Sequence, residues 1–397
     1  MNRPIYLDYQ ATTPLDERVL DAMLPFFRED FGNPHSVHHA YGQRASDAVE
    51  AARAEVAATL GAEPREVIFT SGATESNNTA IKGAAYFHQR FDKRHLITAP
   101  SEHKCVLESC KRLEREGFEV TYLPVDRDGL IDPKALAAAI REDTLLVSIM
   151  AVNNETGVIQ PLERIGAICR ERGVLFHTDA AQAVGKIPLD VQAMNIDLLS
   201  ISGHKLYGPK GIGALYLRRR PRARIEPMMD GGGQERAMRS GTVPTPLAVG
   251  LGEACRIAAE EMEGEYARLA ALQARLQAGL ESAFPALAVN GSLEHRIPGN
   301  LNVTVPGGLA AEALIEELES VAVSTASACS SASVEPSYVL TAMGLSEDAA
   351  AASLRIGLGR FTTEAEIDTA VREIASAAER LRASGRGGIP ESGRAAE

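Results

Sequence analysis

Chemically versatile side chains follow several short apolar runs of this sequence, at the points where the runs end. Asp179 follows the run at 174–177, and Lys205 comes shortly after the run at 198–201. A lysine in such a place can form an imine, and a carboxylate there can bind a ligand nitrogen. Each also has an ordinary interpretation, namely a helix N-cap for Asp179 and a surface lysine for Lys205.

Residues 70–74, Thr-Ser-Gly-Ala-Thr, join an apolar run to a helical pattern. The first turn of a helix presents unpaired N–H groups and the positive end of the helix dipole, which suit a phosphate, although an ordinary N-cap is the alternative. The usual dinucleotide and nucleoside triphosphate motifs are absent. Together with Lys205, Asp179 and the flat ring of His103, the segment matches the needs of pyridoxal phosphate. That cofactor takes a lysine for the Schiff base, a carboxylate at the pyridine nitrogen and a phosphate site.

Apolar runs alternate with helical patterns over most of the chain and would position these residues. Most of the runs are continuously apolar, as expected for strands covered on both faces, with helices such as 74–87 and Leu162–Arg172 between them. The pattern predicts a doubly wound α/β domain with a mostly parallel sheet, in which ligands bind at the carboxyl ends of the strands. The predicted strands are 67–69, 96–98, 120–123, 145–152, 174–177, 198–201 and 213–217.

Flanking patterns complete the expected architecture. Thr13 is the predicted N-cap of a first helix with Pro14 at N1 and Phe27 on its apolar face, and a second helix covers 45–60. A long helix at 247–284 leads to a smaller α+β unit with strands at 300–305 and 320–323 and helices at 310–318 and 364–381. We expect a large domain at 15–260 and a small domain at 1–14 and 261–383, which carries a cysteine loop at about 324–335. The Gly-, Ser- and Arg-rich tail at 384–397 is expected to be disordered.

Composition and charge exclude several classes of protein. The 397 residues are 45% hydrophobic and 24% charged, with 53 acidic against 41 basic residues and a net charge of −12. Such a surface repels nucleic acid and anionic membranes, so neither is expected as a partner, and the basic run at 218–224 is interpreted as a solvated loop. No signal segment or bilayer-spanning stretch is recognisable. Five scattered cysteines without a C-x-x-C pair argue against disulfides and zinc and favour a cytoplasmic enzyme.

The sequence resembles the NifS/IscS-type cysteine desulfurases, within the class V aminotransferase-like pyridoxal phosphate enzymes, and is most similar to the IscS branch. The resemblance extends from Tyr6 to about Leu381. It implies the type I fold of pyridoxal-phosphate-dependent transferases and a homodimer that converts L-cysteine to L-alanine. The motifs that carry it are Ala11-Thr12-Thr13-Pro14, Phe31-Gly32-Asn33-Pro34, residues 70–76, Val152-Asn153-Asn154-Glu155, Ser202-Gly203-His204-Lys205, Gly231-Gly232-Gly233-Gln234-Glu235, Arg239-Ser240-Gly241-Thr242 and Arg355.

The resemblance implies a role for each matching residue. Lys205 would bind the cofactor as an imine, Asp179 would pair with its ring nitrogen, and His103 would stack on the ring and assist proton transfer. Gln182 would lie near the ring hydroxyl. Thr242 would reach the phosphate of the neighbouring subunit. Asn154 and Arg355 would bind the substrate carboxylate, and Asn154 would also contact the cofactor. The residues implied at the phosphate are Ala73, Thr74, Ser202 and His204.

Cys329 lies among small residues with nothing apolar to bury it, which favours an exposed loop. A single cysteine is more often buried and inert, but the resemblance makes Cys329 the nucleophile that takes sulfur from L-cysteine as a persulfide. Lys205 or His103 would remove the substrate α-proton.

The sulfur would serve iron–sulfur cluster assembly on an IscU-type scaffold and other acceptors. No resident metal is expected, although the Cys329 persulfide could transiently ligate a cluster shared with the scaffold. The other four cysteines, in helical patterns, are predicted to be structural.

Two departures from the family pattern leave questions open. Ala326 replaces the family glycine in the cysteine loop, and the tail after Leu381 does not resemble the IscS C-terminus, so the acceptor protein is undetermined. The alternatives are another class V activity, such as a selenocysteine lyase or an aminotransferase, or a non-catalytic sulfur-relay protein. Cys329 argues against a transaminase, which needs no protein thiol, and the presence of Lys205, Asp179 and His103 argues against a non-catalytic protein.

Overall fold

The larger unit of the protein is built on a seven-stranded sheet. The structure, a computed structural model, describes residues 3–325 and 336–389. Strands follow the order β2-β8-β7-β6-β5-β3-β4, and β8 runs in the direction opposite to the other six. The strands are β2 (Val67–Thr70), β3 (His95–Thr98), β4 (Glu119–Tyr122), β5 (Thr144–Ser148), β6 (Leu175–Asp179), β7 (Leu198–Ser202) and β8 (Gly213–Leu217).

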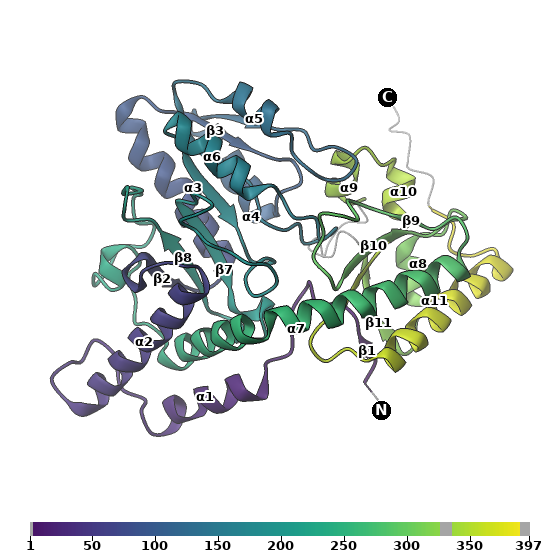
Figure 1. Cartoon of the computed structure of the whole chain (residues 1–397), viewed down its shortest axis with the longest axis horizontal. Helices are drawn as coiled ribbons and strands as arrows, with labels where there is room; N and C mark the ends of the chain where they lie inside the picture. Colours follow the sequence, from purple (N-terminus) through teal and green to yellow (C-terminus); the bar gives the residue numbers. More distant parts are fainter. Residues whose placement is uncertain (1–2, 326–335, 390–397) are drawn as a thin grey trace.

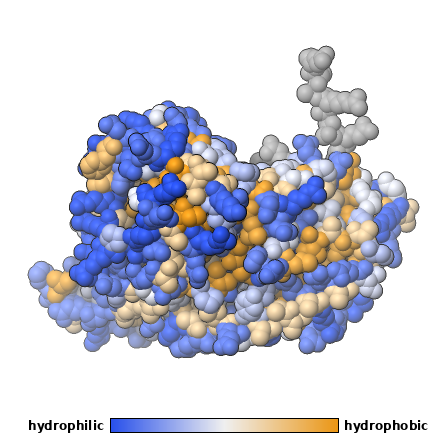
Figure 2. All heavy atoms as spheres, turned by 45° about the horizontal axis from the view of Figure 1, so that its top comes forward, coloured by the Kyte–Doolittle hydropathy of each residue, from blue (hydrophilic) through white to orange (hydrophobic). Residues whose placement is uncertain are grey.

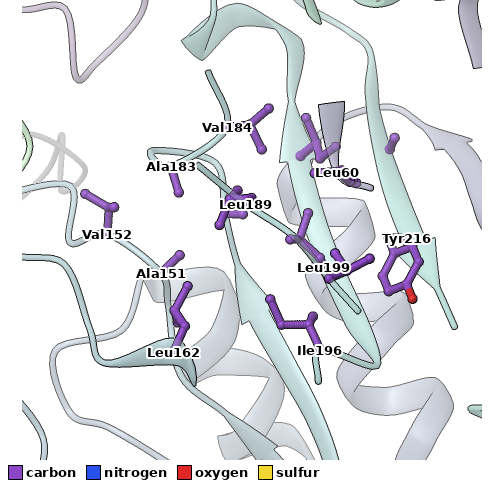
Figure 3. Packing of buried hydrophobic residues seen from close by; sticks show 14 of the residues in the cluster. Leu60, Ala151, Val152, Leu162, Ala183, Val184, Leu189, Ile196, Leu199 and Tyr216 are labelled. Atoms are coloured by element: carbon purple, nitrogen blue, oxygen red, sulfur yellow. The ribbon is translucent and has the colours of Figure 1, made fainter. Parts of the chain in front are cut away.

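Helices cover both faces of this sheet, and the strands supply buried side chains to each face in alternation. Ile68 packs with α3 (Ala73–His88) and α4 (Lys104–Arg115) on one face, whereas its neighbour Phe69 belongs to the cluster on the other face. Figure 3 shows part of the second cluster, with Leu199 and Tyr216 beside each other. Helices that contribute to that cluster include α1 (Glu17–Arg28), α2 (Ala40–Thr59), α5 (Pro133–Ala139), α6 (Leu162–Arg172) and the first part of α7 (Thr245–Ala283). The predicted α/β fold class is therefore confirmed.

The smaller unit joins residues from both ends of the chain. A four-stranded antiparallel sheet has the order β12-β13-β10-β9, and β1 pairs with β11 in parallel. In Figure 1, α7 runs along both units and α11 lies beside its second half. The elements are β1 (Ile5–Tyr6), β9 (Ala288–Val289), β10 (Asn300–Thr304), β11 (Val321–Ala322), β12 (Ser324–Thr325), β13 (Ser353–Gly357), α8 (Ala311–Glu316), α9 (Tyr338–Ala342), α10 (Glu347–Ala351) and α11 (Glu364–Ser384).

The start of the first helix was predicted wrongly. Asp16 is the N-cap of α1 and accepts from the backbone N–H of Arg18 at 3.0 Å. The Thr13 hydroxyl instead donates to the carbonyl of His204 at 3.0 Å and accepts from the backbone N–H of Tyr207 at 2.9 Å. Phe27, expected on the apolar face, is 56% exposed. Thr13 thus anchors the segment that follows β7 rather than a helix.

The basic run and the ends of the domains differ in part from expectation. Arg218 is buried and forms an ion pair with Asp197 at 3.2 Å, so the solvated loop begins only after it. The expected boundary at residue 260 lies inside α7, as the predicted long helix at 247–284 implies. Helix α9 lies in the range expected for the small domain but contributes Val339 and Leu340 to the core of the larger unit. At the expected tail, Ala310 N–H donates to the carbonyl of Gly387 at 2.8 Å, while residues 390–397 lie outside the described residues. No helix in the described part of the chain is long and apolar enough to cross a bilayer.

Candidate active site

A cavity of about 510 Å³ opens at the carboxyl ends of β5, β6 and β7. Its size is typical of a site for a small organic molecule. Figure 2 shows one face of the molecule, with hydrophobic side chains visible in the hollow between the two units. Thr242 is exposed and does not line the cavity, and Cys329 lies outside the described residues. The predicted site residues that line it are Ala73, Thr74, His103, Asn154, Asp179, Gln182, Ser202, His204, Lys205 and Arg355.

The N-terminus of α3 faces the cavity without a capping side chain. Gly72 is the N-cap, its φ is +149°, and no side chain accepts a hydrogen bond from the first turn. Gly213 on β8 lies so close that a Cβ there would come within 2.6 Å of Gly72 Cα. Small residues therefore keep this turn open, and the ordinary N-cap interpretation does not hold. The first-turn N–H groups at Ala73 and Thr74 form a suitable anion site.

Glu75 stands in the same helical turn, where a bare carboxylate would repel an anion. It accepts from Arg239 Nε at 2.8 Å and from the backbone N–H of Ser71 at 2.8 Å. Burial alone would raise the pKa of Glu75, but the bonds from Arg239 and Ser71 outweigh burial and lower it. The carboxylate is thus neutralised by Arg239, which also joins the Arg239-Ser240-Gly241-Thr242 segment to the site.

Asp179 ends β6 with both carboxylate oxygens engaged. Oδ1 accepts from the backbone N–H of Ala181 at 2.9 Å, and Oδ2 accepts from Asn77 Nδ2 at 2.6 Å. The two interpretations of Asp179 therefore both apply, since it caps the turn that follows and also lines the cavity. Asn77 is fully buried on α3 and was not predicted, because only the packing of α3 against the sheet brings it to Asp179.

Lys205 lies in the short 3-10 turn Gly203–Lys205 directly after β7. Its Nζ donates to the carbonyls of Ala11 at 2.8 Å and Gln10, so it is partly buried and not an ordinary surface lysine. Gln182 Nε2 donates to the same Gln10 carbonyl at 2.9 Å. Gln182 Oε1 accepts from Lys186 Nζ at 2.7 Å. Burial and the nearby charge of Lys205 lower the pKa of Lys186 to about 7. The sequence signal for the contact between Lys186 and Gln182 is their spacing of four residues.

His204 contributes a neutral ring to a positively charged end of the cavity. Burial, followed by the charges of Lys205 and Lys210, lowers the pKa of His204 to about 4. Its Nδ1 lies 3.0 Å from Thr12 Oγ1. The two lysines and the α3 N-terminus together favour an anionic group here.

His103 is the N-cap of α4, and its Nδ1 accepts from the backbone N–H of Cys105 at 3.2 Å. Cys105 Sγ lies 3.0 Å from the same nitrogen and lines the cavity. Cys105, predicted to be structural, lies on α4 as its helical pattern predicts and also contacts the cavity. Cys110 and Cys255 are buried, and burial raises the pKa of each thiol to about 12, as expected for inert cysteines.

Glu102, just before His103, is a buried carboxyl group that the sequence analysis did not single out. Its Oε1 accepts from the backbone N–H of Met150 at 2.6 Å. Burial, together with the charge of Asp179, raises the pKa of Glu102 well above its usual range. Burial therefore favours the uncharged form of this carboxyl group, which lies beside His103 in the chain.

Arg355 on β13 closes the side of the cavity formed by the smaller unit. Its Nη2 donates to Asp8 Oδ1 at 2.8 Å and Ser324 Oγ at 2.9 Å, and its Nη1 donates to the carbonyl of Asn154 at 3.3 Å. Arg355 Nε and Asn154 Oδ1 are buried without a hydrogen-bond partner among the described residues. Pairing of β12 with β13 places Ser324, one residue before the described segment ends, directly beside Arg355.

Residues 5–370 match the model of the aminotransferase class-V family. A cysteine desulfurase of Pongo abelii is 60% identical over 380 residues, which are 96% of this chain and 83% of that protein. A cysteine desulfurase IscS of Anaeromyxobacter sp. (strain Fw109-5) is 58% identical over 382 residues, which are 96% and 94% of the two chains.

Solved structures agree with these relatives. A NifS-like protein is 39% identical, with a TM-score of 0.89, and the match covers 95% of this chain and 100% of that one. SspA in complex with cysteine is 43% identical, with a TM-score of 0.80, and the match covers 90% and 99% of the two chains. Since these matches extend over nearly the whole chain, the protein belongs to the class-V aminotransferase family and, within it, to the cysteine desulfurases of the NifS/IscS type.

Proposed function

We propose that this cysteine desulfurase binds pyridoxal phosphate in the cavity, transfers the sulfur of L-cysteine to Cys329 as a persulfide, and delivers it for iron–sulfur cluster assembly and to other acceptors. The observation that carries the proposal is the meeting of Lys205, Asp179 and the uncapped N-terminus of α3 in one cavity. These groups match a lysine-bound cofactor that has one ring nitrogen and one phosphate.

The residues present fit pyridoxal phosphate. The N–H groups of Ala73 and Thr74, with Ser202 and His204, would hold the phosphate, and Asp179 would hold the ring nitrogen. The buried and unpartnered Oδ1 of Asn154 supports the fit, because such an acceptor calls for a donor from a ligand. When bound, the cofactor supplies an electron sink for negative charge at the substrate α-carbon.

The other groups of the cavity bind the substrate and move its proton. Arg355, with Asn154, would bind the carboxylate of L-cysteine, for which a guanidinium is well shaped. Lys205 or His103 would take the α-proton. A thiolate at Cys329 would then attack the substrate sulfur, so that the carbon–sulfur bond breaks and the product L-alanine leaves.

The position of the chain on both sides of residues 326–335 supports Cys329 as the nucleophile. Ser324, before this segment, hydrogen-bonds to Arg355 in the cavity wall. After the segment, Tyr338 donates through its hydroxyl to the carbonyl of Glu102, next to His103. Both described ends therefore lie beside the cavity, as a segment that carries the nucleophile requires.

A homodimer is part of the proposal. Thr242 is exposed and outside its own cavity, which suits a residue that reaches the phosphate of a neighbouring subunit. Beside it, Pro34 and His35 share a surface depression with Glu235 and Val243. An apolar surface of the kind that a second copy covers lies at the connection of α1 and α2, where Phe27, Phe31, Val37 and Tyr41 are exposed.

The scaffold partner and a cytoplasmic location are also part of the proposed function. A relative from Dictyostelium discoideum is named as mitochondrial.

The test is alanine release from L-cysteine in the presence of a reductant. Wild type and Cys110→Ala, a control cysteine that is buried on α4, should release alanine, whereas Cys329→Ala should release almost none. Wild type should be yellow and Lys205→Ala should lose that absorbance. Equal alanine release by wild type and Cys329→Ala would contradict the role of Cys329. A yellow wild type that releases no alanine would refute the proposed substrate.

A further inference from the structure

Four polar side chains form a continuous series of contacts along one wall of the cavity. Asp179 Oδ2 accepts from Asn77 Nδ2 at 2.6 Å, and the same Nδ2 lies 3.1 Å from Cys105 Sγ. Cys105 Sγ lies 3.0 Å from His103 Nδ1. The outer two residues are those expected at the ring nitrogen and over the ring. The two between them have no assigned part in the reaction.

The orientation of Asn77 decides the direction of these hydrogen bonds. A carboxylate at Asp179 accepts only, so Asn77 must turn its NH₂ group toward it, and the second N–H of that group reaches Cys105 Sγ. Asn77 Oδ1 is consequently buried with no hydrogen-bond partner among the described residues. A buried acceptor in that state is unfavourable, which indicates that the contacts on the NH₂ side control the side chain.

Cys105 in turn decides the protonation of His103. Its sulfur accepts from Asn77 Nδ2, and the S–H of a thiol there can donate to His103 Nδ1, which is within reach. The backbone N–H of Cys105 donates to the same nitrogen at 3.2 Å. Two donors directed at Nδ1 require a lone pair there, so a neutral imidazole carries its proton on Nε2.

We propose that Cys105 is a positioning residue of the desulfurase, which holds His103 as the Nε2–H tautomer and connects it through Asn77 to Asp179. The catalytic consequence rests on the proposed function. In this tautomer His103 can donate a hydrogen bond from Nε2 but cannot take a proton there. Removal of the substrate α-proton then falls to Lys205, and His103 orients or protonates.

The test uses nitrogen NMR of the full-length apoprotein labelled with ¹⁵N-histidine, with the His103 signals assigned by their loss in His103→Gln. Wild type should show the proton on Nε2. Cys105→Ala should shift the tautomer ratio by roughly 5-fold toward the Nδ1–H form, since a hydrogen bond has been lost. Cys105→Ser, which keeps a donor, should restore the wild-type ratio, and Cys110→Ala on the same helix should not change it.

Kinetics of the cofactor-loaded enzyme separate this inference from the proposed function. Cys105→Ala should lower kcat roughly 3- to 10-fold with little change in KM, and Cys105→Ser should recover most of it. A proton on Nδ1 in wild type, or a ratio that does not change in Cys105→Ala, would overturn the inference even if the enzyme releases alanine. The expected tautomers in a protein that releases no alanine would uphold the positioning by Cys105 and refute the proposed reaction.

Discussion

Replacing Arg53 with methionine should destabilise the protein by about 3–5 kcal/mol, because it leaves a buried carboxylate without its partner. Arg53 Nη1 and Nη2 each bond to a Glu235 oxygen at 2.7 Å, and both side chains are 3% exposed. Glu235 also accepts from the backbone N–H of Phe69 at 2.7 Å. The φ angles of Glu235, Arg236 and Ala237 are 45°, 57° and 63°, a left-handed conformation that persists only where its surroundings enforce it.

The expected loss converts to a change in melting temperature. Unfolding entropy of about 2.1 cal/mol/K per residue, over 397 residues, amounts to about 0.8 kcal/mol/K. A destabilisation of about 3–5 kcal/mol then lowers Tm by about 4–6 °C. Differential scanning calorimetry of the apoprotein, for wild type and Arg53→Met at the same concentration, measures this shift.

Two further variants test the reasoning. Arg275 and Asp368 form a surface pair at 2.7 Å with side chains 46% and 40% exposed, so Arg275→Met should cost less than about 1 kcal/mol. Adding Glu235→Gln to Arg53→Met removes the unpaired charge and should recover at least half of the lost Tm. A shift for Arg53→Met no larger than that for Arg275→Met would refute the anchoring role of the buried pair.

Three further changes have defined expected results. Arg355→Lys should raise KM for L-cysteine by about 10- to 100-fold with a smaller effect on kcat in steady-state assays, because lysine lacks the guanidinium fork; an unchanged KM would separate Arg355 from substrate binding. Ala237→Gly should raise the free energy of unfolding by about 1 kcal/mol, because glycine tolerates the positive φ, and a calorimetric decrease would contradict this. Lys186→Met should raise Tm of the apoprotein at pH 7, and the gain should shrink toward pH 10. The pKa of folded Lys186, about 7, lies below its ordinary 10.5, so the unfolded state binds more protons between these values and wild-type stability rises with pH there. A gain that does not vary with pH would rule out this charge effect.

Local sequence patterns determined most of the elements and the set of candidate site residues. A strand covered by helices on both faces must be apolar on both sides, so the central strands were recognisable from runs of a few residues, and α6 begins and ends where its helical pattern does. Because parallel strands end at one edge of the sheet, the polar residues after those runs, such as Asp179 and Lys205, were predicted to meet. The structure brings both to the same cavity.

Tertiary structure alone decided which side chains hold these residues in place. Asn77 reaches Asp179 across 102 positions of sequence, and Arg53 reaches Glu235 across 182. Thr13 has the local pattern of an N-cap, yet its hydroxyl is taken by His204 and Tyr207. Strand and helix patterns depend on neighbours two to four residues apart, whereas these partners depend on the order of the strands and on how the helices pack on them. No local pattern encodes that arrangement, because it is set by burial of the whole core at once.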